Sequence, residues 1–217
     1  MALKNIFVIG PPGCGKSTQA SLLAERMNMY CMESGQILRD YVAAGGPRAA
    51  EMDGYLAGGN LVPSDFLIEV LKEKIQAVPA DKGLVFNGYI RRLIEAQTVQ
   101  KLLTEMGRQI DAVFFLKVDK EQTIERISNR RTCEVCKTPF TVGKDVASEN
   151  APCPRCGGAL ARRNDETVEK LQERWREFEN ETMQSIEYFR AQGLVKEING
   201  MQPIEDVYRE IVGYLQD

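Results

Sequence analysis

A glycine-rich segment near the N-terminus has the composition of a phosphate-binding loop. Residues 10–17 read G-P-P-G-C-G-K-S and match the pattern G-x-x-x-x-G-K-[ST] in full. The glycines of such a loop let backbone N–H groups turn toward phosphate oxygens, and the lysine adds a positive charge. We therefore predict that Lys16 contacts the β- and γ-phosphates of a nucleotide and that the hydroxyl of Ser17 is a ligand for Mg²⁺. The alternative is a chance glycine-rich turn, which the surrounding strand and helix patterns disfavour.

Four of the six cysteines form a second chemical pattern. They occur as two C-x₂-C pairs with sixteen residues between them: Cys133 and Cys136, then Cys153 and Cys156. Each pair can present two thiolates on one tight turn, and two such turns complete a tetrahedron around Zn²⁺. Four thiolates leave no open coordination position, so the spacing predicts a structural zinc site. A redox dithiol, an iron–sulfur cluster and disulfides are the alternatives, and the spacing and a reducing compartment favour zinc.

Composition and charge narrow the class of protein. The chain has 217 residues, a net charge of −3 and no histidine. The chemistry must therefore work without an imidazole, and no global basic field favours nucleic acid or an anionic membrane. No apolar run approaches the roughly 18 residues of a membrane span. The N-terminal segment does not look like a signal peptide, because it leads directly into the glycine-rich loop. We expect a cytoplasmic protein.

The elements that must position these residues alternate along the chain. Continuous apolar runs predict buried strands at 6–9, 84–86, 113–116 and, more weakly, 195–198. Helical patterns fall at 17–27, 36–44, 64–77, 94–106, 120–130, 166–190 and 203–215. This alternation favours an α/β fold with a parallel sheet flanked by helices. Two stretches interrupt it: a Gly/Ala-rich, helical excursion at 45–62 and the cysteine-containing segment at 132–163, which has no helical period.

Taken together, these motifs resemble those of the nucleoside monophosphate kinases, and most closely adenylate kinases of the long, zinc-lid type. The resemblance covers nearly the whole chain. Beyond the glycine-rich loop it rests on short motifs, which are S-G-Q-I-L-R at 34–39, G-N-L-V-P-S-D at 59–65, N-G-Y-I-R at 87–91, R-I-S-N-R-R at 126–131 and G-M-Q-P at 200–203.

The resemblance implies an architecture and a reaction. The fold would be a P-loop NTPase-type core with a helical insert that binds the nucleoside monophosphate (NMP) and a zinc-ribbon-like lid insert. The core would comprise 1–33, 63–131 and 164–217, the NMP-binding insert 34–62 and the lid 132–163. The reaction would be reversible transfer of the γ-phosphoryl group of Mg²⁺·ATP to an NMP, giving ADP, with AMP the default acceptor. The family is usually monomeric, and we expect the same here.

The resemblance also implies roles for individual residues. Those expected to hold ATP are Gly10, Pro12, Gly13, Cys14, Gly15, Lys16, Ser17 and Thr18 for the phosphates, with Arg126 and the backbone of Gln202 at the base. Those expected to bind the monophosphate nucleotide are Ser34, Arg39, Leu61, Val62, Gly88, Arg91, Glu95, Arg163 and Arg174. Those expected to stabilise the transferring phosphoryl group are Lys16, Arg91, Arg130, Arg163 and Arg174. This set suits a reaction that depends on positioning and positive charge.

The segment that leaves the lid can be aligned in two registers. The family pattern R-x-D-D is followed by an arginine eleven residues after the first. Beginning at Arg163 places Arg174 at that position, whereas beginning at Arg162 places Glu173 there. We favour Arg163, because one ungapped frame then supplies both cations.

The chain departs from the family pattern at several positions near the expected site. Asn87 stands where the family has an Asp that orients the Mg²⁺ water shell, and Ser17 stands where these kinases usually have Gly. We hypothesise that the Ser17 hydroxyl recovers part of the Mg²⁺ contact. Ile90 replaces a Pro in the turn that carries Arg91, and Gln36 replaces an Asp.

The position that reads the acceptor base is also changed. Seven residues after Gly88 the adenylate kinases carry Gln, and this chain has Glu95. An ionised carboxylate only accepts hydrogen bonds, so it suits the N1–H and N2–H₂ edge of guanine better than adenine. Gln97 could compensate through a shifted turn, and a solvent-exposed helix residue is the alternative for Glu95.

Three functions remain open at this point. The first is an NMP kinase, with AMP or, given Glu95, GMP or another NMP as acceptor. The second is a catalytically weakened nucleotide-binding protein that acts as a sensor or binds a partner, as Asn87 and Ile90 would allow. The third is a kinase of similar fold acting on a non-nucleotide alcohol. The third function is disfavoured by residues that resemble a monophosphate pocket, namely Ser34, Arg39, Leu61 and Val62.

Overall fold

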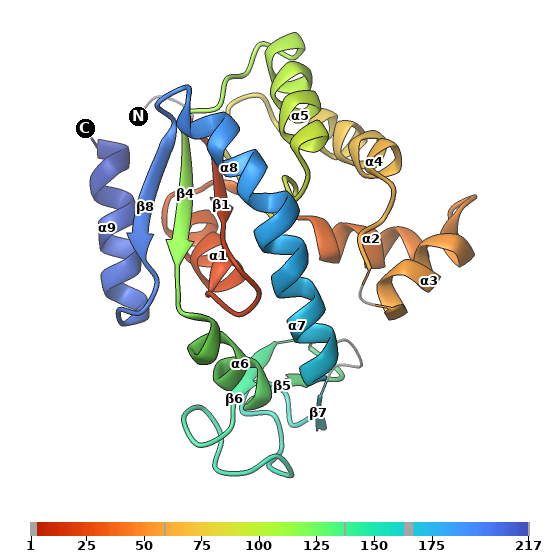
Figure 1. The fold of residues 1–217 in the computed structure, drawn as a ribbon. Coiled ribbons are helices and arrows are strands. Elements are labelled where there is room, and N and C mark those ends of the chain that lie inside the picture. The colour runs from red at the N-terminus through yellow and green to blue at the C-terminus, as the bar shows by residue number, and fades with distance from the viewer. Residues whose placement is uncertain (1–3, 59, 137, 163–166, 217) are drawn as a thin grey trace.

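A five-stranded parallel sheet forms the centre of the protein. The computed structural model describes residues 4–58, 60–136, 138–162 and 167–216. The strand order is β2-β3-β1-β4-β8, with all four neighbouring pairs parallel (Figure 1). The strands are β1 (Asn5–Ile9), β2 (Tyr30–Glu33), β3 (Leu84–Asn87), β4 (Ala112–Lys117) and β8 (Val195–Asn199). The predicted α/β fold is confirmed.

Helices cover both faces of this sheet and bury two apolar clusters. Successive side chains of a strand point to opposite faces. In β1, Ile6 and Val8 therefore join the cluster beneath α1 (Lys16–Arg26) and α9 (Ile204–Gln216). Phe7 joins the cluster on the other face, against the helices α4 (Ser64–Gln76), α5 (Leu93–Glu105) and α8 (Met183–Arg190). The loop that follows β1 therefore leaves from the buried centre of the sheet.

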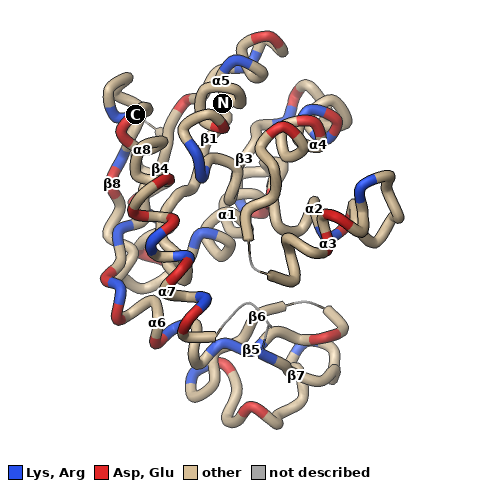
Figure 2. The backbone as a smooth tube through the Cα atoms, turned by 45° about the vertical axis from the view of Figure 1, so that its right-hand side comes forward, with Lys and Arg blue, Asp and Glu red and all other residues tan. Residues whose placement is uncertain are grey.

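Two projections extend from the carboxyl-end side of the sheet (Figures 1 and 2). The first, here called the arm, contains α2 (Ser34–Ala43) and α3 (Ala49–Gly58). The second, here called the lid, is a small antiparallel sheet of order β6-β5-β7, built from β5 (Arg130–Cys133), β6 (Pro139–Thr141) and β7 (Leu160–Ala161). Helix α3 confirms the helical excursion predicted within 45–62.

The structure corrects three sequence-based expectations about elements. Strand β2 was not predicted; it is a short edge strand in which only Met32 is buried, so it lacks a continuous apolar signal. The helix predicted at 120–130 ends earlier, as α6 (Lys120–Ser128), and Arg130 begins β5. The single helix predicted at 166–190 is interrupted by a π-helical turn, η1 (Phe178–Thr182), between α7 (Val168–Glu177) and α8. Such π-turns often occur at functional sites.

The two helices that flank the lid are tied together inside the protein. Helix α6 enters the lid, and α7 leaves it. The indole N–H of Trp175 on α7 donates a buried hydrogen bond of 2.8 Å to the hydroxyl of Thr123 on α6. This contact fixes the base of the lid on the core.

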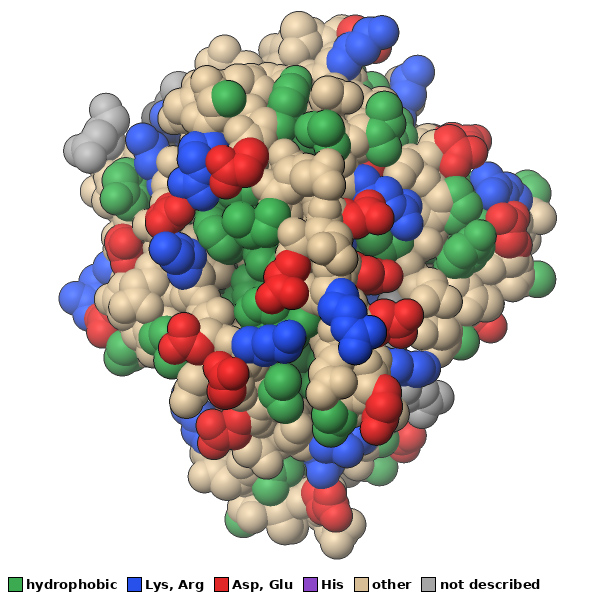
Figure 3. Space-filling model, in the orientation of Figure 1, with side chains coloured by type: hydrophobic (Ala, Val, Ile, Leu, Met, Phe, Trp, Pro, Cys, Tyr) green, Lys and Arg blue, Asp and Glu red, His purple; other side chains and the backbone are tan. Residues whose placement is uncertain are grey.

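The surface carries both signs of charge. On the face shown in Figure 3, acidic and basic side chains alternate without a large patch of either sign. Among the described residues, no helix has the length and apolar character needed to span a membrane.

Candidate active site

A cavity of about 1810 Å³ opens between the sheet, the arm and the lid. It contains nearly all of the predicted site residues. Those of the glycine-rich loop that line it are Gly10, Pro12, Gly13, Cys14, Gly15, Lys16, Ser17 and Thr18. Those from other elements are Ser34, Arg39, Leu61, Gly88, Arg91, Arg126, Arg130, Arg174 and Gln202. The fold thus brings together residues that are far apart in the sequence.

The glycine-rich loop is shaped by two glycines in left-handed conformations. Gly13 has φ 78°, and Gly15, the residue before α1, has φ 99°. Residues with a Cβ rarely adopt these values. The Lys16 ammonium donates to the carbonyl oxygens of Gly10 and Pro11, both at 2.7 Å, so it lies across the mouth of the loop. Burial lowers the pKa of Lys16, and the nearby Cys14 thiol partly opposes this shift.

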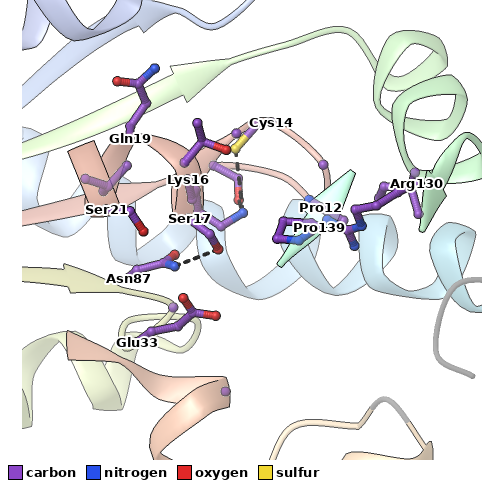
Figure 4. A pocket seen from close by; sticks show the side chains of 18 of the residues that line it. Pro12, Cys14, Lys16, Ser17, Gln19, Ser21, Glu33, Asn87, Arg130 and Pro139 are labelled. Atoms are coloured by element: carbon purple, nitrogen blue, oxygen red, sulfur yellow. Dashed lines mark hydrogen bonds between the residues drawn. The ribbon is translucent and has the colours of Figure 1, made fainter. Parts of the chain in front are cut away.

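Ser17 and Asn87 contact each other at the edge of this loop. The Asn87 side-chain amide at the end of β3 donates a 2.9 Å hydrogen bond to the Ser17 hydroxyl in the first turn of α1 (Figure 4). Two of the residues that depart from the family pattern therefore form one pair. Both present uncharged oxygen atoms, which are suitable ligands for Mg²⁺ or for its bound water.

The arm contributes a second group of polar contacts. The Ser34 hydroxyl donates to the carbonyl oxygen of Gly88 at 2.8 Å. Gly88 has φ 81°, and a Cβ there would lie 2.6 Å from that hydroxyl, so only glycine fits this turn. On α2, the guanidinium of Arg39 donates to the side-chain oxygen of Gln36 at 3.0 Å. Gln36 thus orients Arg39, although it replaces the acidic residue of the family motif. Val62 is buried rather than at the cavity wall.

Cationic side chains converge on the cavity from three directions. Arg91 comes from the turn after β3, Arg130 from the lid and Arg174 from α7. The positive charges of Arg91 and Arg174 contribute to lowering the pKa of Lys16, after the larger effect of burial. Such convergence suits a ligand with several negative charges. Lysine and arginine supply all of this positive charge, so binding such a ligand requires no histidine.

The nucleoside end of the expected ATP site has two further contacts. Arg126 donates to the carbonyl oxygen of Gly200 at 3.2 Å, so α6 and the loop after β8 form one wall. Gln202 lies in that loop and donates to the Glu210 carboxylate at 2.7 Å.

The lid-exit register stays a prediction. Arg163 lies outside the described residues. Arg162 lines the cavity, and its guanidinium donates to the carbonyl oxygen of Ser128 at 2.8 Å.

Glu95 does not line the cavity. The residue is 1% exposed, so the alternative of a solvent-exposed helix residue is wrong. One carboxylate oxygen accepts hydrogen bonds from the backbone N–H groups of Arg91 and Arg92, at 2.8 and 3.0 Å, and the other accepts one from Ser64. These contacts occupy both oxygens with protein donors.

Sequence reasoning missed two polar residues of the π-turn region that line the cavity, Glu177 and Thr182. Burial raises the pKa of Glu177, which lies near Arg91 and Arg174. Its position three residues after Arg174 would place both on one helix face, and this spacing is the signal that could have found it. Thr182 has no comparable signal, because it reaches the cavity only through η1.

The lid cysteines form a compact cluster. The four sulfur atoms of Cys133, Cys136, Cys153 and Cys156 lie within 4.8 Å of one another, and all four thiols are free. The Cys133–Cys156 and Cys136–Cys153 sulfur separations are 3.5 and 3.6 Å. A tetrahedral zinc ion with Zn–S bonds of about 2.3 Å requires sulfur separations of about 3.8 Å. The donor set and its spacing therefore fit Zn²⁺.

Comparison with known proteins gives one consistent result. A family model described as adenylate kinase matches residues 8–194. A curated adenylate kinase of Archaeoglobus fulgidus is 34% identical over 212 residues, 98% of each chain. Curated adenylate kinases of Syntrophotalea carbinolica and Syntrophomonas wolfei are 32% and 33% identical, covering 97% and 95% of this chain and 97% and 96% of their own lengths.

Proposed function

The chain belongs to the adenylate kinase family, and we propose that its central cavity transfers the γ-phosphoryl group of ATP reversibly to AMP. Family membership makes it an ATP-dependent nucleoside monophosphate kinase. A different acceptor or a weakened, non-catalytic role is not favoured by these relationships. The observation that carries the proposal is the convergence of Lys16, Arg91, Arg130 and Arg174 on one cavity above the glycine-rich loop.

ATP binds with its phosphates in the loop of residues 10–18 and its base between Arg126 and Gln202. Two features of the loop support this role. The backbone N–H groups at the start of α1 form the positive end of the helix dipole, which attracts phosphate. Lys16 now donates to two loop carbonyl oxygens, and it exchanges these for phosphate oxygens when the triphosphate enters.

The monophosphate nucleotide binds between the arm and the turn after β3. Arg39 and Arg91 grip its phosphate, Ser34 and Gly88 form the floor, and Leu61 borders the nucleoside. Gln36 supports this role for Arg39 by accepting a hydrogen bond from its guanidinium. The phosphates of donor and acceptor then face each other across the cavity, with Lys16 and Arg91 between them.

Phosphoryl transfer needs positioning and charge more than proton chemistry. The charge that develops on the equatorial oxygens is stabilised by Lys16, Arg91, Arg130, Arg174 and, in the favoured register, Arg163. These groups are held by separate elements, so their full convergence requires the lid to move over the nucleotides. Closure also excludes water, which would otherwise accept the phosphoryl group.

Two metal ions complete the proposal. Ser17 and Asn87 would hold Mg²⁺ and its water shell, because their side chains meet at the phosphate end of the loop and carry a hydroxyl and an amide oxygen. When bound with ATP, Mg²⁺ supplies positive charge that neutralises the β- and γ-phosphates. Zn²⁺ at the four lid cysteines is structural, since four thiolates leave no place for substrate. The domain boundaries 1–33, 63–131 and 164–217 for the core, 34–62 for the arm and 132–163 for the lid remain part of the proposal.

A coupled assay of ADP release tests this function. Purified protein with Mg²⁺ is assayed with ATP and each of AMP, GMP, CMP, UMP and the deoxynucleoside monophosphates, and Lys16→Ala serves as control. We expect turnover that is highest with AMP and is lost in the control. ATP binding without turnover on any acceptor would contradict the proposal, as would a preference for GMP. That the protein works as a cytoplasmic monomer, without nucleic acid or membrane, stays a prediction.

A further inference from the structure

The backbone of Arg91 is held on both sides by buried side chains. Its N–H donates to a carboxylate oxygen of Glu95 at 2.8 Å. Its carbonyl oxygen accepts a hydrogen bond of 3.0 Å from the hydroxyl of Thr182. Glu95 belongs to α5 and Thr182 to η1, so two elements from distant parts of the chain fix a single residue.

Glu95 holds more than one group of this turn. The same carboxylate oxygen accepts the N–H of Arg92 at 3.0 Å, and the other oxygen accepts the hydroxyl of Ser64 at 2.8 Å. Glu95 is the third residue of α5, where an acidic side chain that accepts N–H groups before the helix stabilises the helix N-terminus. At 1% exposure this carboxylate has little access to water, and its bonds are correspondingly costly to lose.

Arg92 extends the cluster to the arm and to η1. Its guanidinium donates to the carbonyl oxygen of Val62 at 3.1 Å, where the arm returns to the core. It also lies 3.6 Å from Glu95 and 3.5 Å from Glu181. The charges of Arg92 and Glu95 therefore compensate each other, and the pair bridges the end of the arm, the start of α5 and the π-turn.

We propose that Glu95 is a positioning residue for Arg91. In this role Glu95 makes no contact with the acceptor base itself. The inference rests on the proposed function, in which the Arg91 guanidinium grips the acceptor phosphate. The turn at 88–91 contains Ile90 and no proline, so its backbone has no ring to restrain φ. The Glu95 carboxylate supplies that restraint from outside the turn.

This role differs in its consequences from base reading. A residue that reads the base changes the relative affinity for AMP and GMP. A residue that positions the phosphate-gripping arginine changes the affinity for every nucleoside monophosphate by the same factor. The two roles therefore predict opposite results for one conservative substitution.

Glu95→Gln is that substitution. Its amide oxygen can still accept from the two backbone N–H groups, but its NH₂ group would then face the Arg92 guanidinium, which carries only donors. The Ser64 hydroxyl could accept from this NH₂ group only in competition with Arg92, which already donates to it at 3.3 Å. We expect the turn to loosen and KM for AMP to rise about tenfold, since a weaker grip of Arg91 on the phosphate lowers the affinity for the acceptor, and a tenfold loss corresponds to only about 1.4 kcal/mol. KM for ATP should change less than twofold, and the ratio of the GMP and AMP dissociation constants, measured by calorimetry, should stay within about twofold.

Two further variants and one control sharpen the experiment. Thr182→Val removes the other restraint on Arg91 and should also raise KM for AMP. Ser64→Ala removes one contact of Glu95 but leaves both backbone bonds, so its effect should be smaller. Glu105→Gln lies at the exposed end of the same helix and should change nothing. Melting temperatures for all variants identify any that fail to fold.

Three results separate the possibilities. An unchanged KM for AMP in folded Glu95→Gln and Thr182→Val would overturn the inference while leaving the kinase function intact. A gain of tenfold or more for AMP relative to GMP in Glu95→Gln would overturn it in favour of base reading. Absence of turnover in the wild-type protein would instead contradict the proposed function.

Discussion

The side-chain amide of Asn87 donates a hydrogen bond of 2.9 Å to the hydroxyl of Ser17, across 70 residues of sequence. It links the end of β3 to the first turn of α1, at the mouth of the phosphate-binding loop. Each residue departs from the family pattern, and their contact indicates that the two departures act together. A hydroxyl and an amide here take the place of a glycine and a carboxylate.

If Ser17 and Asn87 act together, their substitutions should not be additive. Ser17→Ala and Asn87→Ala should each weaken binding of Mg²⁺·ATP, and the double variant should be little weaker than either single one. The expected coupling energy is about 1 kcal/mol, the usual contribution of one hydrogen bond. Calorimetric dissociation constants with and without Mg²⁺ measure it, with Ser148→Ala on the lid surface as control. Additive losses would show that the two residues act independently.

Lys16→Met should abolish most of the activity. The variant keeps the length of the side chain but removes the positive charge above the loop, and loss of one group that stabilises transferring charge costs at least about 100-fold in kcat. Steady-state kinetics measure the effect, and Lys101→Met, an exposed lysine on α5, is the matched control. Because Lys16 also donates hydrogen bonds to two loop carbonyl oxygens, the melting temperature of the variant must be compared with that of the wild-type protein. Activity within tenfold of wild type would remove Lys16 from the site.

Removing zinc should unfold the lid and leave the core intact. The insert at 132–163 buries few apolar side chains, so without metal it has little core to hold its fold. Cys153→Ser or a chelator should release one equivalent of zinc in elemental analysis and open the lid to proteolysis. Cys31→Ser, outside the cluster, should retain the metal. A metal-free wild-type protein with a protease-resistant lid would contradict the zinc site.

The Trp175–Thr123 contact should contribute measurably to stability. Trp175→Phe removes the buried indole N–H but keeps an aromatic ring, and we expect a loss of about 1 kcal/mol in the free energy of unfolding. Urea denaturation gives this value. It is followed by circular dichroism, because the variant lacks the only tryptophan of the chain and so has no tryptophan fluorescence to follow. In combination with Thr123→Val, the losses should be less than additive because both variants break the same bond. Full additivity would mean that the bond carries no energy of its own.

Features that depend on neighbouring residues could be predicted from the sequence. The loop at 10–17, the two cysteine pairs and the central strands are local patterns, in which residue type and spacing alone determine the backbone or the ligand set. Helices α4, α5 and α9 likewise begin and end close to their predicted bounds. The identity of the family follows from such short motifs, because each one carries its chemistry within a few residues.

Features that depend on distant contacts were decided by the tertiary structure. The sequence placed Glu95 at a base-reading position, whereas the fold buries its carboxylate under the N–H groups of Arg91 and Arg92. No pattern in the sequence indicated that Ser17 and Asn87 are in contact, or that a π-turn brings Thr182 to the carbonyl oxygen of Arg91. A side chain's partner is set by where separate elements pack, and hydrogen-bond energies depend on burial. Neither quantity is encoded in the spacing of residues along the chain.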